Sequence, residues 1–407
     1  MLPERCDLLV VGAGILGLAV ARELAARYPT RKVAVIDAAD RVGAHQTGHN
    51  SGVLHRGIYY LPGSLKAQLC VEGAGRMEEY CERHGIAVDH CGKLIVAVTR
   101  AELAGLDELE RRGSANGVPG LRRLTGDELV ELEPAVRGLA ALHSPRTAIV
   151  DYRAVAERLA ADVVEAGGSI SLRCAATGVR PGRGHLRVIL RQGEIRSAAT
   201  VFCAGAWADR LAVAAGGAAD PRIVPFRGGY LRLRPERRDL VRSLIYPVPD
   251  PDLPFLGVHL TRHPSGDVLL GPTALLAPAR DAYRLGAARA GDVASTLAWP
   301  GSWRMARRWW RTGLGELRMA ASRRAFVAAA ARYVPALTVD DVLPGPAGVR
   351  AQAVGRDGSL VDDFVFSHTE RALHVRNAPS PGATSSLAIA RHVVDMAARR
   401  FDLPQPA

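Results

Sequence analysis

The chain of 407 residues has very little lysine and few cysteines. Only three of its 53 basic residues are lysines, so the net charge of +12 rests on arginines that are spread along the chain among many alanines. A protein that binds nucleic acid usually gathers its basic residues on one surface and carries a recognisable binding module. The sequence has no such module, and we expect no nucleic-acid partner.

Cysteine pairs and membrane-spanning runs are also missing. The six cysteines are too sparse for a disulfide scaffold, and none forms the Cys-x-x-Cys pair of a structural zinc site. The N-terminal run LLVVGAGILGLAVA is too short to cross a membrane, and Glu4 and Arg5 before it make a poor signal peptide. We expect reduced thiols and a cytoplasmic protein. Its 48% hydrophobic and 23% charged residues are typical of a globular chain of two domains.

The first feature that the chain does have is a predicted βαβ unit. Apolar patterning indicates a strand near 6–11, a helix near 15–28 and a second strand near 33–37. Three glycines at the first turn have the spacing G-x-G-x-x-G: Gly12, Gly14 and Gly17. In this motif the first glycine permits a tight turn, the second lets the backbone approach a pyrophosphate, and the third lets helix and strand pack closely.

An acidic residue follows the second predicted strand. Asp37 comes twenty residues after Gly17, where a carboxylate can accept hydrogen bonds from ribose hydroxyls. In this strand-turn-helix-strand context, the glycine motif predicts dinucleotide binding. At this point the residues leave FAD and NAD both open.

The segment HQTGHNSGVLHRGIYY, residues 45–60, is rich in histidine and glycine. His45 and His49 have the helical spacing of a metal pair, and His55 could add a third ligand. Gly48 and Gly52 disfavour a regular helix, however, and no nearby carboxylate or cysteine completes a ligand set, so we predict no metal site. A polar glycine-rich loop after the second strand, in place of a further βα unit, favours FAD over NAD.

Two later turns are further candidates for cofactor contact. A predicted strand ends at Cys203 and turns through Gly205 into a helix. Gly382, Ala383 and Thr384 stand just before a C-terminal helix, where free backbone N–H groups can meet an acceptor.

Several segments together make the chain recognisable, among them HQTGHNSGVLHRGIYYLPGSLKAQLC, VPFRGGYLRL, PGPAGVRAQAV and NAPSPGATSS. They resemble the L-2-hydroxyglutarate dehydrogenase/oxidase family, within the glycine oxidase and D-amino-acid oxidase superfamily, over residues 5–395. The resemblance implies non-covalent FAD. It also implies oxidation of the C2 hydroxyl of L-2-hydroxyglutarate to give 2-oxoglutarate, with quinone or oxygen as the electron acceptor.

The resemblance implies an α/β fold in which a Rossmann-like FAD-binding domain is interleaved with an α+β substrate domain. The substrate domain should be built on a mostly antiparallel sheet. The expected FAD-binding segments are 1–88, 146–218 and 333–407, and the expected substrate-domain segments are 89–145 and 219–332.

Several site residues follow from the resemblance. The loop should pass beside the flavin and contact the cofactor through Thr47, Asn50 and Ser51, with His55 and Tyr60 facing the reaction site. The substrate hydroxyl must lose a proton near neutral pH, which suits histidine, and the candidates for the base are His259 and His55.

The two carboxylates of the substrate call for arginine. The resemblance places Arg350 at the carboxylate-binding position of the superfamily. Arg262 and Arg227 are weaker candidates for the second carboxylate, because the chain holds 50 arginines.

Some positions depart from the family pattern. Gly229 stands where an acidic residue is usual, Thr273 where asparagine is usual, and residues 278–279 lack a common aromatic and lysine. These departures keep open an FAD-dependent oxidase of a different 2-hydroxy acid. An FAD-dependent oxidase of an amino acid is the second alternative, because it would use the same fold. A flavin-binding protein without catalysis is the third alternative.

Residues 301–317, GSWRMARRWWRTGLGEL, predict a basic amphipathic helix. On a helical projection Trp303 and Trp310 fall on one side, while Arg307 and Arg308 gather on the other. Such a helix suits a peripheral contact through 303–311 with the inner face of the plasma membrane. The alternative is a helix whose apolar face packs on the protein core.

Overall fold

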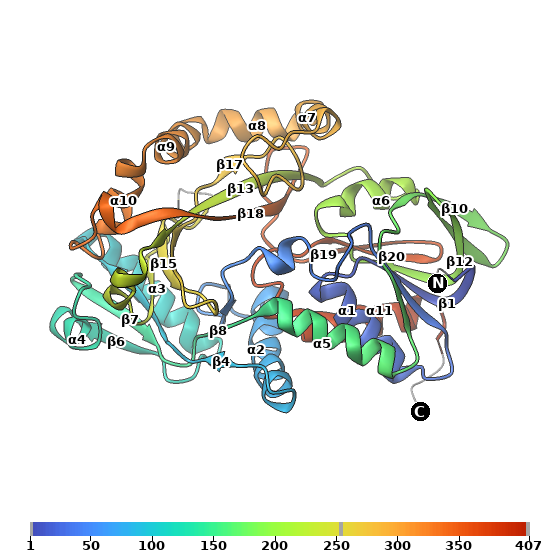
Figure 1. The fold of residues 1–407 in the computed structure, drawn as a ribbon, viewed down its shortest axis with the longest axis horizontal. Coiled ribbons are helices and arrows are strands. Elements are labelled where there is room, and N and C mark those ends of the chain that lie inside the picture. The colour runs from blue at the N-terminus through green and yellow to red at the C-terminus, as the bar shows by residue number, and fades with distance from the viewer. Residues whose placement is uncertain (1–2, 252–254, 404–407) are drawn as a thin grey trace.

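The computed structural model describes residues 3–251 and 255–403, which form two large sheets with helices around them (Figure 1). Eight strands make the first sheet: β1 (Arg5–Val11), β2 (Val33–Ile36), β9 (Ser169–Ser171), β10 (Ala176–Gly182), β11 (His185–Leu190), β12 (Gly193–Phe202), β19 (Val365–Thr369) and β20 (Ala372–Asn377). The strand order is β10-β11-β12-β1-β2-β9, with β20 also paired to β12 and β19 paired to β20.

The centre of this sheet is parallel and buried. β1 pairs in parallel with both β2 and β12, and its apolar run LLVV lies in the core, as expected for a strand covered on both faces. Helices α1 (Ile15–Arg27), α5 (Tyr152–Glu165) and α11 (Ser386–Arg400) belong to the same hydrophobic core, joined by α2 (Leu65–Arg83). The predicted strand, helix and strand at the N-terminus are confirmed to within a residue or two.

Nine strands make the second sheet: β5 (Lys93–Ala97), β6 (Arg122–Thr125), β7 (Ala140–Ser144), β13 (Arg222–Leu233), β14 (Leu244–Pro247), β15 (His259–Arg262), β16 (Val268–Gly271), β17 (Leu275–Leu276) and β18 (Val342–Val354). Only β5 and β14 pair in parallel, so the expected mostly antiparallel sheet is confirmed. α3 (Arg100–Ala115) and α4 (Gly126–Leu132) pack beside β5, β6 and β7.

The chain crosses between the two sheets several times. A small third sheet, made of β3 (Val53–Leu54), β4 (Val88–Asp89) and β8 (Ala148–Val150), lies where the chain leaves and re-enters the first layer. β18 falls within the expected third FAD-binding segment, 333–407, yet it pairs with β13 in the second sheet. By sheet membership the chain therefore returns to the first layer at β19 and not at residue 333.

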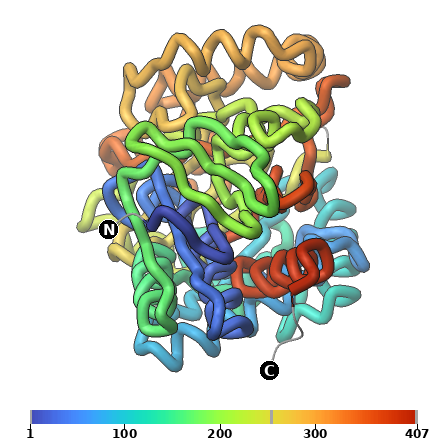
Figure 2. The backbone as a smooth tube through the Cα atoms, turned by 90° about the vertical axis from the view of Figure 1, so that its right-hand side faces the viewer, coloured from blue at the N-terminus to red at the C-terminus, as the bar shows by residue number. Residues whose placement is uncertain are grey.

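Three helices form a layer at the top of Figures 1 and 2, in orange: α7 (Ala290–Leu297), α8 (Pro300–Arg308) and α9 (Trp310–Ala321). The helix that follows, α10 (Arg323–Ala331), lies lower in Figure 1 and packs Phe326 and Val327 into the core of the second sheet. The single helix predicted for 301–317 is wrong, because the backbone leaves helical geometry at Trp309 and begins again in α9. No helix in the described part of the chain is long and apolar enough to cross a membrane.

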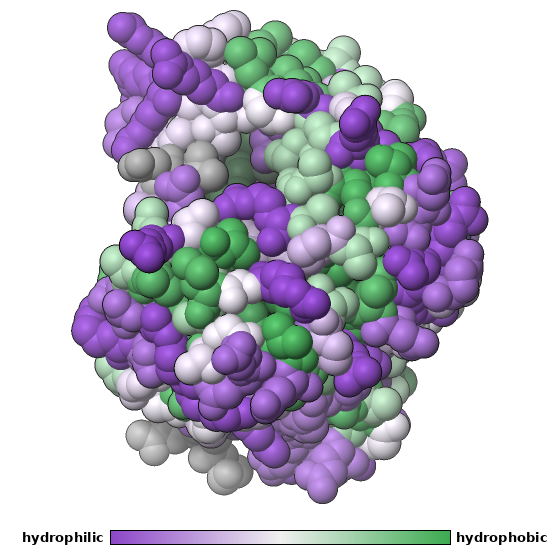
Figure 3. Space-filling view, turned by 90° about the vertical axis from the view of Figure 1, so that its left-hand side faces the viewer, coloured by the Kyte–Doolittle hydropathy of each residue, from purple (hydrophilic) through white to green (hydrophobic). Residues whose placement is uncertain are grey.

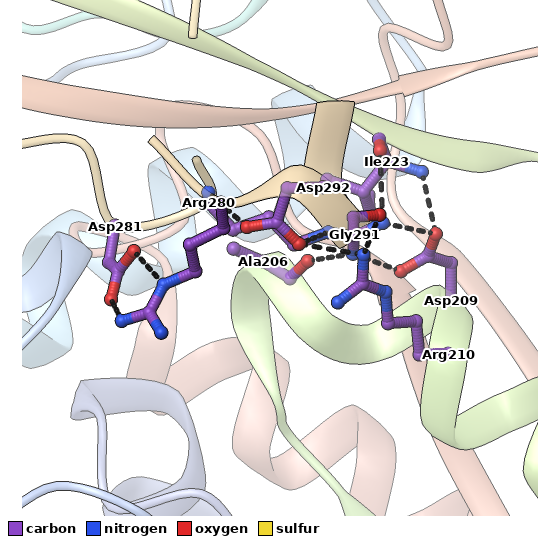
Figure 4. Close-up of polar contacts among 9 residues, drawn as sticks. Ala206, Asp209, Arg210, Ile223, Arg280, Asp281, Gly291 and Asp292 are labelled. Carbon is purple, nitrogen blue, oxygen red and sulfur yellow. Dashed lines mark hydrogen bonds and ion pairs between the residues drawn. The ribbon is translucent and has the colours of Figure 1, made fainter. Parts of the chain in front are cut away.

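A buried ionic cluster ties this region to the first layer (Figure 4). The guanidinium of Arg280 is 1% exposed and donates to Asp209 on α6 (Ala208–Ala214), with Nη2 2.9 Å from Oδ2. It also donates to the carbonyl oxygens of Ala206 and Ile223. The Arg280 backbone N–H donates to Asp292 on α7. The loop after β17 is therefore held against α6 by bonds that satisfy a charge fully removed from water.

We predict that Arg280→Met lowers the free energy of unfolding by about 3–5 kcal/mol, because Asp209 stays buried without its cation, whereas Asp292 keeps its ion pair with Arg210. Arg83→Met is the matched control. Arg83 pairs with Glu79 on the surface of α2, and its loss should cost less than about 1 kcal/mol. Urea unfolding of the two FAD-saturated variants measures both effects, and equal costs would contradict the role given to the cluster.

Candidate active site

A cavity of about 1720 Å³ is lined by residues of both sheets and of the loops between them. Pockets for small ligands usually measure about 300–1,000 Å³, so this cavity has room for a dinucleotide together with a substrate. Figure 3 shows a hollow on one face of the molecule, below the upper layer of helices. One end of the cavity is lined by the glycine-rich turn and the other by β13, β15 and β18.

The glycine-rich turn has no space for side chains. Gly12 has φ +118°, and a Cβ there would lie 2.3 Å from the carbonyl oxygen of Cys203. A Cβ on Gly17 would lie 1.9 Å from the carbonyl oxygen of Gly12. Both positions therefore require glycine, the first for its turn and the second for the packing of α1 on the strand. Gly14 precedes α1 and lines the cavity.

Asp37 joins the two chain segments that flank this turn. Its carboxylate accepts hydrogen bonds from the backbone N–H groups of Ala13, at 2.6 Å, and Ala39, at 2.7 Å. The side chain remains partly accessible and lines the cavity. Asp37 thus has a structural role before any ligand binds, and each of its oxygens keeps a lone pair that could accept a further hydrogen bond.

The loop at 45–51 folds over the start of α1. It contains only a short 3-10 turn, Gln46–Gly48, and Thr47 Oγ1 accepts a hydrogen bond of 3.0 Å from the Ile15 N–H. The Asn50 side chain is used within the loop, since it donates to the Thr47 carbonyl and accepts from the Gly52 N–H. Thr47, Asn50 and Ser51 all line the cavity.

The histidines of this loop do not converge. His49 stacks on Tyr283, with ring centroids 3.8 Å apart, and His45 packs edge-on against Trp207. His55 lies further along, against β5. Among the described residues, no three side chains of the metal-binding kinds form a group.

Thr384 organises the opposite wall. Its hydroxyl oxygen accepts a hydrogen bond of 3.1 Å from the His55 backbone N–H and lies 2.9 Å from the hydroxyl of Tyr152. Gly382, Ala383 and Thr384 line the cavity immediately before α11, and Gly205 lines it after β12. The predicted cofactor residues, far apart in sequence, therefore share one cavity.

His259 lies at the start of β15, where it lines the cavity. Its Nδ1 is 2.9 Å from the carbonyl oxygen of Gly257, and its ring stacks on Tyr246 at 4.2 Å. A carbonyl can only accept, so Nδ1 carries the proton and Nε2 keeps a lone pair. Burial, with Lys93 and Arg350 nearby, lowers the pKa of His259 to about 4, so the ring is neutral at pH 7.

His55 lines the same part of the cavity. Its Nδ1 is 3.5 Å from the Nζ of Lys93, a buried residue that the sequence reasoning missed. Burial and the charge of Lys93 hold the pKa of His55 well below its usual range. The signal for Lys93 was present, since a lysine begins the apolar strand KLIVA in a chain with only three lysines.

Arg350 points into the cavity from β18, opposite Phe226 of β13. Its guanidinium lies 4.5 Å from the ring centroid of Phe255, and no carboxylate within the described residues forms an ion pair with it. The side chain is exposed to the cavity, yet the surrounding protein partly desolvates it and lowers its pKa, while Tyr230 and the charge of Asp362 act in the opposite direction. An arginine without a counterion in a cavity is a site for an anion.

The weaker arginine candidates lie elsewhere. Arg262 forms an ion pair with Asp89 at 3.2 Å, and Arg227 donates to the Ala282 carbonyl at 3.1 Å. Neither lines the cavity. Tyr60 does line it, with the Nζ of Lys66 5.0 Å from its ring centroid.

Two departures from the family pattern are neighbours in space. The Gly229 N–H donates to Thr273 Oγ1 at 3.0 Å, and the Thr273 N–H donates to the Gly229 carbonyl at the same distance. Thr273 lines the cavity, whereas Gly229 and residues 278–279 do not. These two departures are therefore a single coupled change in one cavity wall.

Comparison with known proteins identifies this arrangement. The model of the family described as FAD dependent oxidoreductase matches residues 7–396. The chain belongs to this family. It is 45% identical to the mitochondrial L-2-hydroxyglutarate dehydrogenase of Homo sapiens, over 98% of this chain and 89% of the relative. It is 41% identical to the L-2-hydroxyglutarate dehydrogenase of Escherichia coli, over 95% of this chain and 92% of the relative.

A solved structure supports the same fold. The L-alpha-glycerophosphate oxidase of Mycoplasma pneumoniae, solved with FAD bound, superposes with a TM-score of 0.80 at 23% identity. It covers 99% of this chain and 96% of its own. The expected α/β fold of the FAD dependent oxidoreductases is confirmed.

The residues present fit FAD, the cofactor of this family. The turn that excludes a Cβ at Gly12 leaves the backbone open, and the Asp37 carboxylate and the start of α11 face the same cavity. The turn and Asp37 would hold the adenosine and pyrophosphate half, and the Thr384 segment would approach the flavin. FAD supplies a two-electron acceptor at this site when it is bound.

We predict that Asp37→Ala raises the FAD dissociation constant by at least about tenfold, because it removes both a ribose acceptor and the bonds to Ala13 and Ala39. Ultrafiltration of the yellow protein at decreasing concentration measures this, with Asp127→Ala, an exposed aspartate on α4, as the control. Unfolding in guanidinium should release all of the flavin. Flavin that stays attached to the unfolded chain would contradict non-covalent binding.

Proposed function

We propose that this protein oxidises the C2 hydroxyl of L-2-hydroxyglutarate and yields 2-oxoglutarate. The identity to L-2-hydroxyglutarate dehydrogenases over nearly the whole chain supports this substrate. The observation that carries the proposal is the pairing, in one cavity, of an arginine that forms no ion pair within the described residues with two neutral histidines. A dianionic 2-hydroxy acid needs such a cation, and its hydroxyl needs such a base.

The side chains divide the chemistry between them. Arg350 binds the C1 carboxylate through charge-assisted hydrogen bonds and orients C2. His259, whose Nε2 keeps its lone pair, takes the hydroxyl proton as C2 is oxidised. FAD, when bound, would supply the acceptor for the hydride that leaves C2. Burial of this end of the cavity lowers the pKa of both histidines, so both rings are neutral at pH 7.

A different 2-hydroxy dicarboxylate is the second candidate substrate. The coupled change at Gly229 and Thr273 favours it, because Thr273 lines the cavity. Anaerobic reduction of the flavin by a panel of 2-hydroxy acids and 2-amino acids separates these readings. Reduction by the L and not the D enantiomer of 2-hydroxyglutarate is the expected result, and reduction by amino acids alone would overturn the proposal.

We predict that Arg350→Lys raises KM for L-2-hydroxyglutarate by an amount equivalent to about 2–5 kcal/mol, since the bidentate contact is lost and the carboxylate is left poorly paired. FAD should stay bound. The control is Arg262→Lys, which should leave KM nearly unchanged because Arg262 pairs with Asp89 outside the cavity. Steady-state kinetics of both variants decide between the two arginines, and equal effects would refute the assignment.

We predict that His259→Gln slows flavin reduction by about 10²- to 10⁴-fold, the usual contribution of a general base. Glutamine keeps a polar side chain but cannot accept a proton at pH 7. Stopped-flow reduction at saturating substrate isolates this step from binding. A variant that weakens binding without slowing the step would show that another group is the base.

We further propose that the electron acceptor is a quinone and that the protein reaches it at an anionic membrane surface. Trp303 and Trp310 are 61% and 55% exposed, and Leu314 and Leu317 of α9 are also exposed. Since these side chains face solvent, they do not support the alternative that the whole apolar face of 301–317 packs on the core. In Figure 3 green and purple side chains lie side by side on the upper part of the molecule.

The arrangement of charge also supports a contact with an anionic membrane surface. Four exposed arginines lie in the same segment of chain as these apolar side chains, and they complement anionic lipid headgroups: Arg304, Arg307, Arg308 and Arg311. Arg308 and Trp309 also line the cavity, so the segment proposed to contact the membrane also forms part of the cavity wall. The proposed location is the cytoplasmic side of the plasma membrane, which fits the bacterial relatives and not the mitochondrial ones. Oxygen is the competing acceptor.

We predict that the protein sediments with vesicles of anionic phospholipid at low salt, and that salt or Arg307→Glu with Arg308→Glu releases it, since each basic residue contributes about 1 kcal/mol near such a surface. Arg399→Glu with Arg400→Glu, at the far end of α11, gives a control with the same change in charge. Equal loss in both variants would indicate net charge alone. No sedimentation of the wild type would refute the contact.

A further inference from the structure

Lys93 is a buried cation that the proposed chemistry does not yet use. Its side chain is 1% exposed and begins β5, behind the cavity wall. Within the described residues no carboxylate pairs with it. Its Nζ lies 4.1 Å from the ring centroid of Tyr246, 5.3 Å from that of Tyr59, and 3.5 Å from His55 Nδ1. A buried ammonium needs acceptors, and the nitrogen of His55 is the one acceptor atom among these contacts.

This contact constrains the proton of His55. A lysine ammonium only donates, so the Nδ1 that faces it must carry a lone pair, and the ring proton must then be on Nε2. His259 has the opposite arrangement, because the Gly257 carbonyl fixes its proton on Nδ1. The two histidines of one cavity are therefore prepared for different tasks, one as a donor and one as an acceptor.

We propose that Lys93 is a positioning residue that holds His55 in the Nε2–H tautomer, so that His55 donates a hydrogen bond to the bound substrate and His259 is left as the only base. This rests on the proposed function for the identity of the substrate, but the tautomer itself does not depend on it. The inference explains why a lysine is buried at the start of an apolar strand without a carboxylate.

Lys93 is also the group of this cluster that changes charge near neutral pH. Burial lowers its pKa to about 7. Six other titratable groups face Lys93. They are Cys70 on α2, Cys91 just before β5, His55 and Tyr59 in the loop after β3, Tyr246 on β14 and His259 on β15. Burial raises the pKa of the two thiols to about 12 and about 11, and lowers that of His259 to about 4, so these groups stay neutral between pH 6 and pH 8.

The direction of the pH effect follows. The protonated lysine fixes the His55 tautomer, and this form is populated below the pKa of Lys93. As pH rises through that value the ammonium is lost, His55 is released from the Nε2–H form, and the hydrogen bond to the substrate weakens. A bound dianion favours the charged lysine, so the midpoint in the complex should be higher than in the free enzyme.

The first experiment observes the tautomer directly, in the FAD-bound protein without substrate. Histidine is labelled with ¹⁵N, and long-range ¹H–¹⁵N spectra are recorded at about pH 6, with His55→Gln assigning the signal. The expected spectrum has protonated Nε2 in His55 and protonated Nδ1 in His259. A proton on Nδ1 of His55 in the wild type overturns the proposal, whether or not any Lys93 variant folds.

The second experiment changes the lysine. Lys93→Met keeps the length of the side chain and removes the charge, and Lys32→Met is the control because Lys32 is the only exposed lysine of the three. Lys93→Met should release His55 from the Nε2–H tautomer. It should also weaken 2-oxoglutarate binding about tenfold near pH 6, the value of one charge-assisted hydrogen bond.

The pH profile supplies the decisive contrast. Affinity for 2-oxoglutarate, followed by the flavin spectrum, should fall with rising pH in the wild type and in Lys32→Met, and should be flat in Lys93→Met. A wild-type slope that persists in Lys93→Met overturns the proposal. If the tautomers are as expected but L-2-hydroxyglutarate fails to reduce the flavin, the substrate assignment falls while the role of Lys93 stands.

Discussion

The antiparallel pairing of β13 with β18 decides which side chains face the cavity. These are the two longest strands, and they remain paired from Arg222 with Val354 at one end to Leu233 with Val342 at the other. Directly opposed residues share a face, so Arg350 lies beside Phe226 and Gly348 beside Gly228. A slip of one residue would turn Arg350 away from the cavity.

The loops depend on the same pair of strands. A Cβ at Gly348 would lie 2.7 Å from the His49 carbonyl oxygen, so the loop that begins at His45 rests directly on β18. The loop after β17 reaches over this one, and Tyr283 stacks on His49. Arg280 then fastens that loop to α6. The loop that begins at His45 thus packs on the β13–β18 pair, the loop after β17 packs on that loop, and the buried ionic cluster holds the outer loop in place.

Arg280, Lys93 and Arg350 are cations of two kinds, and the difference separates structure from function. Arg280 is surrounded by aspartates and carbonyl groups and needs no further partner. Lys93, which is also buried, meets aromatic rings and a histidine, and Arg350, whose side chain is exposed in the cavity, lies over the ring of Phe255. Among the described residues neither cation has a carboxylate in direct contact, and such a cation can bind an anionic ligand.

Much of the cofactor half could be predicted from the sequence, because its determinants are local. The glycine spacing and the apolar strands specify the βαβ turn through steric limits within a few residues, and Asp37 follows at a fixed distance. The substrate half could not be predicted in the same way. The pattern of 301–317 gave one amphipathic helix, but the break at Trp309 and the exposure of its tryptophans depend on how α8 and α9 pack.

The amino-acid sequence by itself determined the glycine-rich turn and the family resemblance, and it identified His55, His259 and Arg350 as candidate site residues. Only the tertiary structure separated Arg350 from Arg262, because strand register decides which arginine enters a cavity and which reaches an aspartate outside it. It also brought Lys93 to His55 across 38 residues of sequence. Hydrogen-bond geometry of that kind depends on side chains meeting from separate strands and loops, and no spacing along the chain encodes it.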